Sequence, residues 1–348
     1  MGSMAGTDIL EWRRLARHRT PIHLILFVTD HCNARCGTCF YWRSLNQGNA
    51  LGPEQVERIA RAFGELVWLD ISGGEPFLRK DLAAICYCFA RQNRVRFINI
   101  PTNAIQTEVI ARLVSEILAG DYSFKLNIAV SLDGVGETHD RIRGVPGNYR
   151  RALATLAELR CLRGGQPRLS LSVVTTLMRD NADDVKRLLD LARHEWDVDY
   201  HSINLLRGNP MDPGLQPPTA AQFAQIARLQ LQYLRHYYRG RFGLLAGWMA
   251  VAGRLLLNRY YLRELEGRPR DIACNAGRAS CVIDANGDVY FCELLQKIGN
   301  LKDYDWDFSR LWYDRPALEL RARVEGGCHC THECFHTKNL ILTPWRLL

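Results

Sequence analysis

The sequence predicts an α/β protein built as a partial barrel of six strand–helix units, followed by a small cysteine-rich segment. Short runs rich in Val, Ile, Leu and Phe alternate with helical patterns between residues 21 and 240. Six such units are two fewer than a closed eight-fold barrel contains, so an open or partial barrel is expected. Near the C-terminus the pattern changes to short strands, turns and grouped cysteines.

The expected strands are short apolar runs bounded by turn residues, over residues 23–29, 67–72, 96–102, 125–132, 169–177 and 200–206. Helices are expected between them, over residues 53–65, 81–92, 107–119, 148–163, 182–196 and 219–239. Pro53 in a first turn and glycine after a last turn, at Gly120 and Gly164, are typical helix boundaries. Right-handed crossovers then make the six strands parallel, with a site at their carboxyl ends.

A longer helix is expected over residues 244–266, and a hairpin over 283–290 with Asn286-Gly287 as its turn. The expected organisation has four parts. They are an N-terminal tail (1–20, in which 1–4 resemble an expression scar), the partial barrel (21–240), a linking helix (241–267) and a small C-terminal domain (268–348).

Cysteine content and charge narrow the function classes. The chain shows no secretory signal pattern and no apolar run long enough to span a bilayer, so a cytoplasmic location is expected. Twelve cysteines in a reducing compartment favour metal binding over disulfides. The net charge of +8 forms no dense basic stripe, which argues against nucleic acid as a partner. A membrane-surface role for the helix around 244–257 is a minor alternative.

Cys32, Cys36 and Cys39 follow the first strand directly, in the spacing Cys-x3-Cys-x2-Cys. Three thiolates at this spacing can hold three irons of a cubane and leave the fourth iron open, as a catalytic centre requires. The alternative is structural zinc, which needs four ligands. No fourth cysteine lies nearby, and His31 is badly placed beside Cys32. The pattern therefore favours an iron–sulfur cluster.

This loop, after the first strand of a (β/α)6 partial barrel, resembles that of the radical S-adenosylmethionine (SAM) superfamily. The resemblance implies a [4Fe–4S] cluster whose open iron binds the methionine part of SAM, and an electron donor such as flavodoxin or ferredoxin. Reductive cleavage of SAM would release a 5′-deoxyadenosyl radical, which abstracts hydrogen from a C–H bond. The residue before the third cysteine is often aromatic in the family and is Thr38 here, so Phe40 and Tyr41 are expected to supply the wall for adenine.

The resemblance assigns Gly73, Gly74, Glu75 and Pro76 to the methionine amino group, since glycines permit close backbone approach and a carboxylate accepts from an ammonium. Arg143 is the expected carboxylate clamp. The other expected cofactor contacts lie at later strand ends: Thr102, Asn103, Ser131, Asp133, Thr176 and Arg207. Each can also be an ordinary turn or capping residue, but their recurrence at successive strand ends favours a site. No catalytic acid or base is assigned.

A second cysteine group comprises Cys274, Cys292, Cys328, Cys330 and Cys334. The spacing Cys-x12-Gly-x4-Cys, followed by clustered cysteines, resembles the SPASM and twitch extensions, which implies an auxiliary [4Fe–4S] cluster. The shortened final run favours one such cluster, with two as the alternative. Its expected ligands are Cys274, Cys292 and two of the other three, with Cys281 as a substitute. From the residues alone, zinc held with His329, His332 or His336 stays open.

The predicted function is a radical SAM enzyme of oxidoreductase type, with oxidation or cross-linking aided by the auxiliary cluster. Two substrate classes stay open, a peptide or protein side chain and a small molecule such as a sugar-like alcohol. The roughly twenty residues before the first strand favour a small molecule or a short peptide over a peptide held by its own recognition domain. A non-catalytic zinc or iron–sulfur binding module is a remote alternative. Three cysteines outside these groups, Cys86, Cys88 and Cys161, are expected in the core.

Overall fold

The structure is a computed structural model that describes residues 20–241, 244–268, 274–325 and 327–342. All of the expected N-terminal tail except residue 20 lies outside them. The described strands form one sheet in the order β6-β5-β4-β3-β2-β1-β7-β8-β9. Its first six strands are parallel and consecutive in the chain: β1 (His23–Thr29), β2 (Trp68–Gly73), β3 (Phe97–Thr102), β4 (Lys125–Ser131), β5 (Leu169–Leu177) and β6 (Tyr200–Leu205). The six predicted strands are thus confirmed to within a residue at each end.

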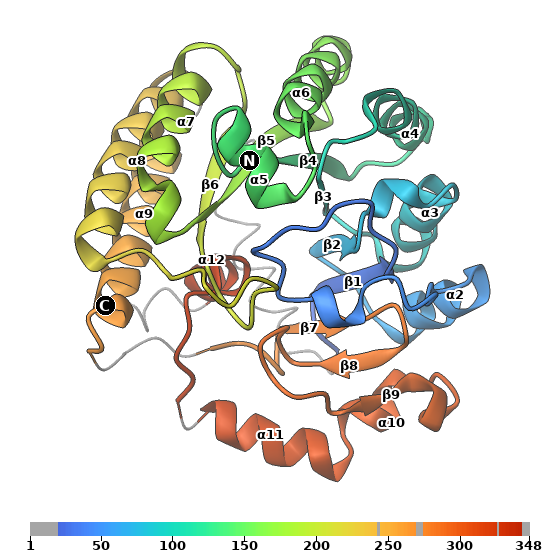
Figure 1. The fold of residues 1–348 in the computed structure, drawn as a ribbon. Coiled ribbons are helices and arrows are strands. Elements are labelled where there is room, and N and C mark those ends of the chain that lie inside the picture. The colour runs from blue at the N-terminus through green and yellow to red at the C-terminus, as the bar shows by residue number, and fades with distance from the viewer. Residues whose placement is uncertain (1–19, 242–243, 269–273, 326, 343–348) are drawn as a thin grey trace.

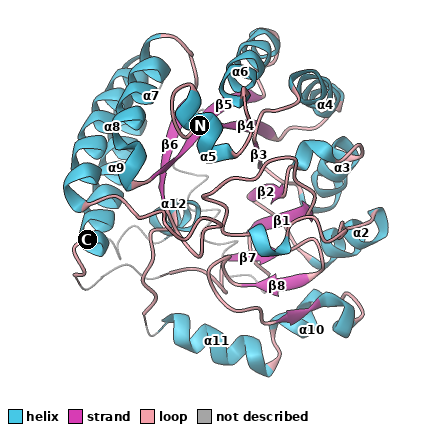
Figure 2. Ribbon diagram, viewed as in Figure 1, coloured by secondary structure: helices cyan, strands magenta, loops and turns pink. Residues whose placement is uncertain are grey.

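Helices follow each strand and cover the outer face of the sheet (Figures 1 and 2). They are α2 (Pro53–Ala62), α3 (Leu82–Asn93), α4 (Thr107–Ala119), α6 (Asn148–Gly164), α7 (Ala182–His194), α8 (Ala220–Arg241) and α9 (Leu244–Leu265). A short helix that the sequence did not predict, α5 (Glu137–Arg143), precedes α6. Among the helices of the described ranges, none combines the length and apolarity that crossing a bilayer requires.

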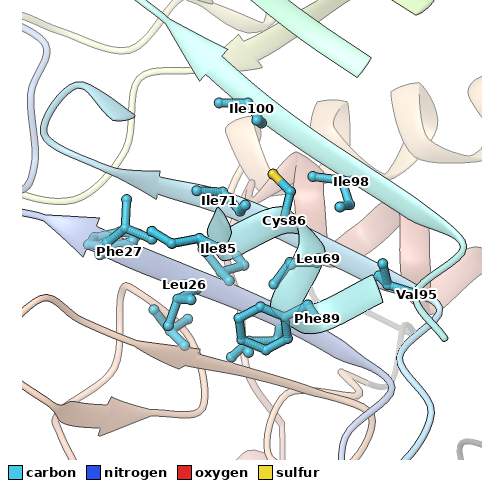
Figure 3. Close-up of a cluster of buried hydrophobic side chains, with 14 of the residues drawn as sticks. Leu26, Phe27, Leu69, Ile71, Ile85, Cys86, Phe89, Val95, Ile98 and Ile100 are labelled. Carbon is cyan, nitrogen blue, oxygen red and sulfur yellow. The ribbon is translucent and has the colours of Figure 1, made fainter. Parts of the chain in front are cut away.

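The main core lies between the strands and these helices. Ile85, Cys86 and Phe89 of α3 lie over Leu69 of β2 and Ile98 of β3, and all five are nearly inaccessible to solvent (Figure 3). Successive strand residues point to opposite faces, so the apolar set faces the helices and the alternate set faces the barrel interior. Cys86 is therefore a core thiol as expected, whereas Cys161 is exposed on α6, which corrects that expectation.

The inner face of the sheet is polar, and a chain of hydrogen bonds crosses five neighbouring strands. His23 Nε2 lies 2.7 Å from Asp70 Oδ2, and Asn99 Nδ2 donates to Asp70 Oδ1 at 2.9 Å. Asn127 Nδ2 donates to Asn99 Oδ1 at 2.7 Å and to Ser172 Oγ at 2.8 Å. These side chains come together because in-register parallel strands place alternate residues side by side. Hydrogen bonds between polar side chains thus connect the strands across the barrel interior, in place of apolar packing.

The C-terminal part continues the same sheet. β7 (Ser280–Ile283) pairs parallel with β1, while β8 (Asp288–Tyr290) and β9 (Gly299–Asn300) run antiparallel. The hairpin predicted at Asn286-Gly287 is confirmed, and Gly287 adopts φ +90°.

Three helices also lie in the C-terminal part, where the sequence predicted only strands and turns: α10 (Phe308–Trp312), α11 (Arg315–Glu325) and α12 (Glu333–Leu342). The pattern missed α12 because this helix buries polar residues, including Glu333, His336 and Asn339, beside Phe335. Burial of polar groups removes the apolar stripe by which a helix is recognised.

Helix α12 lies in the open side of the barrel, between β6 and β7 in Figure 1. Two buried ion pairs hold it there. Lys338 Nζ is 3.2 Å from Asp70 of β2, and Glu333 is 2.5 Å from Arg254 of α9. The last helix therefore fills the position where a closed barrel would have further strands.

Candidate functional site

The first cysteine group lies in the loop that leaves the carboxyl end of β1. Cys32, Cys36 and Cys39 are all partly exposed and free of disulfides. The buried carboxylate of Asp30 shapes the start of the loop, because its Oδ2 accepts from the backbone N–H groups of Gln47 and Asn49. All three thiols are thus presented at the rim of the barrel rather than packed in its core.

Two neighbouring segments clamp this loop. The backbone N–H of Gly37 donates to the carbonyl of Ile142 at the end of α5 at 2.9 Å. On the other side, the N–H groups of Met211 and Asp212 donate to the carbonyls of Cys39 and Gly37 at 3.0 and 2.9 Å. Segments that follow β4 and β6 therefore hold the cysteine loop on both sides.

The two glycines at the end of β2, Gly73 and Gly74, serve the cysteine loop itself. A Cβ atom on Gly73 would lie 2.2 Å from the carbonyl oxygen of Thr29, and one on Gly74 would lie 2.1 Å from that of His31. Gly73 also adopts φ +123°, which L side chains rarely tolerate. The glycines were expected to let the backbone approach a ligand closely. In the structure they let it approach the cysteine loop itself, at Thr29 and at His31, the residue before Cys32.

Glu75 joins the second and third strand ends to the same loop. Its buried carboxylate accepts from Thr102 Oγ1 at 2.9 Å and from the backbone N–H of Asn103 at 2.7 Å. Asn103 Nδ2 in turn donates to Asn33 Oδ1 at 2.8 Å and lies 4.0 Å from Cys32 Sγ. Burial raises the pKa of Glu75 to about 7, although these hydrogen bonds oppose the shift.

Arg143 is held by a carboxylate from the fourth strand end. Its Nε lies 2.9 Å from Asp133 Oδ2, and its Nη1 donates to Cys36 Sγ at 3.6 Å. Asp133 also accepts from the backbone N–H of Thr176 at 2.7 Å. The expected carboxylate clamp is therefore already paired within the protein and directed at the cysteine loop.

The remaining predicted rim residues occupy different environments. Ser131 and Pro76 are buried, at the end of β4 and in the turn after Glu75. The guanidinium of Arg207 lies over the ring of Phe40, 5.2 Å from its centroid. A cleft of about 370 Å³ opens on the other side of the loop, lined by Thr29, His31, Cys32, Asn33, Asn46, Ala50, Leu78 and Arg79.

The electrostatics of the first group suit a bound cation. Burial raises the pKa of Cys32 to about 11 and that of Cys39 to about 12. Metal binding requires thiolates, so an iron cluster would supply the positive charge that these buried thiols lack. A donor set made only of sulfur, with no carboxylate among the three, fits iron–sulfur chemistry.

Four C-terminal thiols form a second group. The Cys328 thiol hydrogen-bonds Cys330, which raises the pKa of Cys328, and thiolate charge on Cys274 and Cys292 raises it further. Charge on Cys330 and Cys274 likewise adds to the effect of burial in raising the pKa of Cys292. These residues come from three places in the chain, and Cys330 lies 3.4 Å from His336 of α12. An all-sulfur set of four fits a cubane.

Cys334 and Cys281 have different surroundings. The charges that act most on Cys334 are those of Lys338 in α12, Asp70 in β2, Arg207 after β6 and Glu293, which directly follows Cys292. Cys281 is fully buried in β7, and burial alone raises its pKa. Of the alternatives that the sequence left open, the geometry brings together Cys328 and Cys330.

The histidines near this group make contacts of their own. His329 lies 3.3 Å from Glu264, His332 hydrogen-bonds Glu293, and only His336 reaches a thiol, at 3.4 Å from Cys330. Within the described ranges, no three His, Cys, Asp or Glu side chains lie close enough to share one metal ion. A single zinc ion is therefore not favoured, whereas a cubane is larger than one ion and takes ligands that are farther apart.

The sequence did not predict the hydrogen bond between the side chains of Glu293 and His332. They lie 39 residues apart, and each is next to or near a thiol of the second group. Burial raises the pKa of Glu293, but His332 and Arg207 outweigh it, so the net pKa is lowered. The available signal was a charged residue directly after Cys292, which spacing alone could not connect to His332.

Comparisons with known proteins agree with this architecture. Residues 26–192 match the model of the Radical SAM superfamily. The chain is 27% identical over 335 residues to mycofactocin maturase MftC of Mycolicibacterium smegmatis, covering 90% of this chain and 76% of that protein. It is also 27% identical over 228 residues to Fe-coproporphyrin III synthase of Methanosarcina barkeri. That match covers 60% of this chain and 54% of the relative, so the chain spans only about half the length of this relative.

Solved structures show the same fold. The structure of Streptococcus suis SuiB bound to precursor peptide SuiA covers 96% of this chain and 73% of its own, with a TM-score of 0.59 and 16% identity. The structure of anSMEcpe with bound AdoMet covers 94% of this chain and 98% of its own, with a TM-score of 0.61 and 15% identity. At such identities the likeness concerns the fold alone.

Proposed function

Because residues 26–192 form the domain of a radical SAM enzyme, we propose that this protein reductively cleaves SAM and uses the resulting radical to modify a peptide. The observation that carries the proposal is the cysteine loop at the barrel rim. Its three thiols are clamped between α5 and the segment after β6, and Arg143 donates to one of them.

We assign Cys32, Cys36 and Cys39 as the ligands of the SAM-binding [4Fe–4S] cluster. When bound, the cluster supplies the electron that cleaves SAM, and its fourth iron is left open for the cofactor. Arg143 donates to the sulfur of Cys36, and Asp133 holds the guanidinium in that direction. Phe40, directly after Cys39, offers an apolar face beside the loop.

The residues expected to contact SAM are proposed in two roles. Glu75, Thr102 and Asn103 form one hydrogen-bonded unit at the second and third strand ends, which orients Asn103 toward Cys32. Gly73, Gly74 and Pro76 set the backbone path of that unit. At the fourth and fifth strand ends, Asp133 holds the position of Arg143 and accepts from the Thr176 N–H, while Ser131 lies buried at the end of β4. The rim is thereby preorganised for a charged ligand.

We assign one auxiliary [4Fe–4S] cluster to Cys274, Cys292, Cys328 and Cys330. The mutual electrostatic influence of these four thiols supports the assignment. We leave Cys334 outside it, because the charges that act most on Cys334 are not those of the other thiols. The division into a barrel (21–240), a linking helix (241–267) and an auxiliary-cluster domain (268–348) is retained as a proposal, with the two outer parts sharing one sheet through β1 and β7.

A peptide is the favoured substrate class. The relative named a maturase matches over 90% of this chain, whereas the porphyrin-related synthase matches over 60%. The maturase match therefore extends into the C-terminal part that contains Cys274 and Cys292, which supports a shared use of that part. An electron donor such as flavodoxin or ferredoxin and a cytoplasmic location complete the proposal, since reduced thiols and a low-potential donor are both needed.

The test is anaerobic reconstitution with iron and sulfide, followed by reduction in the presence of SAM and an assay for 5′-deoxyadenosine. The wild type is compared with a Cys32→Ala, Cys36→Ala, Cys39→Ala triple variant, and iron is counted in both. We expect product from the wild type only, with about four irons retained by the triple variant as one residual cubane requires. Zinc in place of iron, or no product under several reductants, would overturn the proposal.

A further inference from the structure

Arg207 is a half-buried cation without a hydrogen-bonding partner or ion pair in the described part of the chain. It lies two residues after the last residue of β6. Its Nε atom is fully buried and makes no hydrogen bond. A buried polar group left unpaired costs free energy, and a charged group costs more. The stacking on Phe40 at 5.2 Å offsets only part of that cost. An unpaired guanidinium in this position indicates a missing anion.

Other buried or partly buried arginines of the described residues pair with carboxylates or donate to backbone carbonyls, as Arg168 does to Tyr122 and Gly120. Arg143 pairs with Asp133 at 2.9 Å, and Arg254 pairs with Glu333 at 2.5 Å. The acidic group on which the charge of Arg207 acts is Glu293, but that carboxylate is hydrogen-bonded to His332 instead. Arg207 therefore differs from these arginines, because no hydrogen bond or ion pair from the described residues reaches its guanidinium.

The position of Arg207 relates it to both cysteine groups. Phe40, over which it stacks, is bonded to Cys39 of the first group. Its charge acts on Cys334 and on Glu293, which is bonded to Cys292 of the second group. Around the adjacent Gly208, a Cβ would meet Phe40 at 3.0 Å and Leu294 at 3.3 Å. A ligand that reaches Arg207 thus lies between the two groups.

We propose that Arg207 binds a carboxylate of the ligand that occupies this region, which deepens the proposed function and rests on it. The planar guanidinium matches a carboxylate through two parallel hydrogen bonds, and Phe40 holds its plane. The carboxylate comes either from the substrate or from SAM. The neighbourhood of Glu293 and Cys334 favours the substrate, because both residues belong to the C-terminal part and not to the cysteine loop after β1.

The first experiment measures the carboxylate site without turnover. Reconstituted holoenzyme is treated with phenylglyoxal, and modification of Arg207 is followed by mass spectrometry in acetate or in acetamide at equal ionic strength. We expect acetate to slow modification of Arg207 at least fivefold relative to acetamide. The matched control is Arg310, whose guanidinium stacks on Tyr304 at 5.7 Å far from both groups and should respond equally to the two compounds. Equal protection of Arg207 by both compounds would overturn the proposal.

The second experiment identifies the source of the carboxylate. Equilibrium dialysis compares the affinity for SAM with that for decarboxylated SAM in the wild type, Arg207→Gln, Arg207→Lys and Arg310→Gln, after circular dichroism has shown each to be folded. If Arg207→Gln loses the preference for SAM, the carboxylate belongs to the cofactor. If the preference persists, and acetate still protects Arg207 with SAM bound, it belongs to the substrate. Failure of the proposed function would instead abolish 5′-deoxyadenosine in the wild type and leave acetate protection intact.

Discussion

Lys338 Nζ lies 3.2 Å from Asp70 Oδ2, although the two residues are 268 positions apart in the sequence. Burial raises the pKa of Asp70, but the charge of Lys338 and the hydrogen bond from His23 outweigh it and hold the pKa well below its ordinary value. The ammonium therefore stabilises a carboxylate in the barrel interior. Through this pair, the helix that ends the described chain is attached to the second strand.

Loss of this ammonium should destabilise the protein strongly. In Lys338→Met, Asp70 keeps its hydrogen bonds to His23 and Asn99 but loses its cation, and removing one partner of a buried pair costs about 3 kcal/mol. Urea unfolding should show this loss. The matched control is Lys186→Met, because Lys186 pairs with a nearly fully exposed Asp183 and should cost less than about 1 kcal/mol. Equal losses in the two variants would contradict the role assigned to the Asp70–Lys338 pair.

The thiol assignment predicts different iron contents for two serine variants. In the background of the Cys32, Cys36 and Cys39 triple alanine variant, Cys330→Ser should lose most of the remaining iron, about four atoms per chain. Cys334→Ser in the same background should keep it, because the charges that act most on Cys334 are not those of the four assigned thiols. Iron analysis and electron paramagnetic resonance of the reduced proteins provide the measurement. Retention of iron by the first variant together with loss by the second would reverse the assignment.

Gly74→Ala should disrupt the first cysteine group without unfolding the barrel. The new Cβ would lie 2.1 Å from the carbonyl oxygen of His31, so the backbone beside Cys32 must shift. We expect SAM binding to fall at least tenfold and the iron content to drop toward that of the triple alanine variant. Gly164→Ala is the matched control, since no atom lies within 4 Å of a Cβ at that position. If Gly74→Ala binds SAM as tightly as Gly164→Ala, the close approach has no functional importance.

His201 predicts a pH dependence of stability in the acid range. Complete burial lowers its pKa from 6.5 to about 3. Between these values the unfolded chain binds more protons than the folded chain, so the free energy of unfolding rises with pH across this window and is lost as pH falls through it. The contribution is roughly 1 kcal/mol for each pH unit inside the window.

His201→Gln should reduce that slope, because glutamine can still hydrogen-bond Thr175, which lies 2.8 Å from His201 Nε2, but does not titrate. Urea unfolding at a series of pH values from 4.5 to about 6.5 measures the slope. His194→Gln, at an exposed position on the last turn of α7, is the control and should leave it unchanged. An unaltered slope in His201→Gln would show that this histidine is not the group responsible.

Much of the barrel could be predicted because its signals are local. Apolar runs bounded by turn residues gave the six parallel strands, and Cys32, Cys36 and Cys39 lie within eight residues of one another on one loop. The spacing of such a local group restricts which metal centre it can hold, independently of how distant segments pack. The Asn286-Gly287 turn is local in the same sense, because it requires positive φ at Gly287.

The amino-acid sequence by itself therefore determined the six parallel strands and the spacing of the first cysteine loop, and it predicted a second group of C-terminal thiols. Only the tertiary structure decided that Arg143 is paired with Asp133, that Gly74 approaches His31, and that the charges of Cys274 and Cys292 act on Cys328. The physical reason is that each of these relationships depends on the packing of segments distant in the sequence. Helix α12 is held by buried ion pairs, which leave no periodic pattern in the chain.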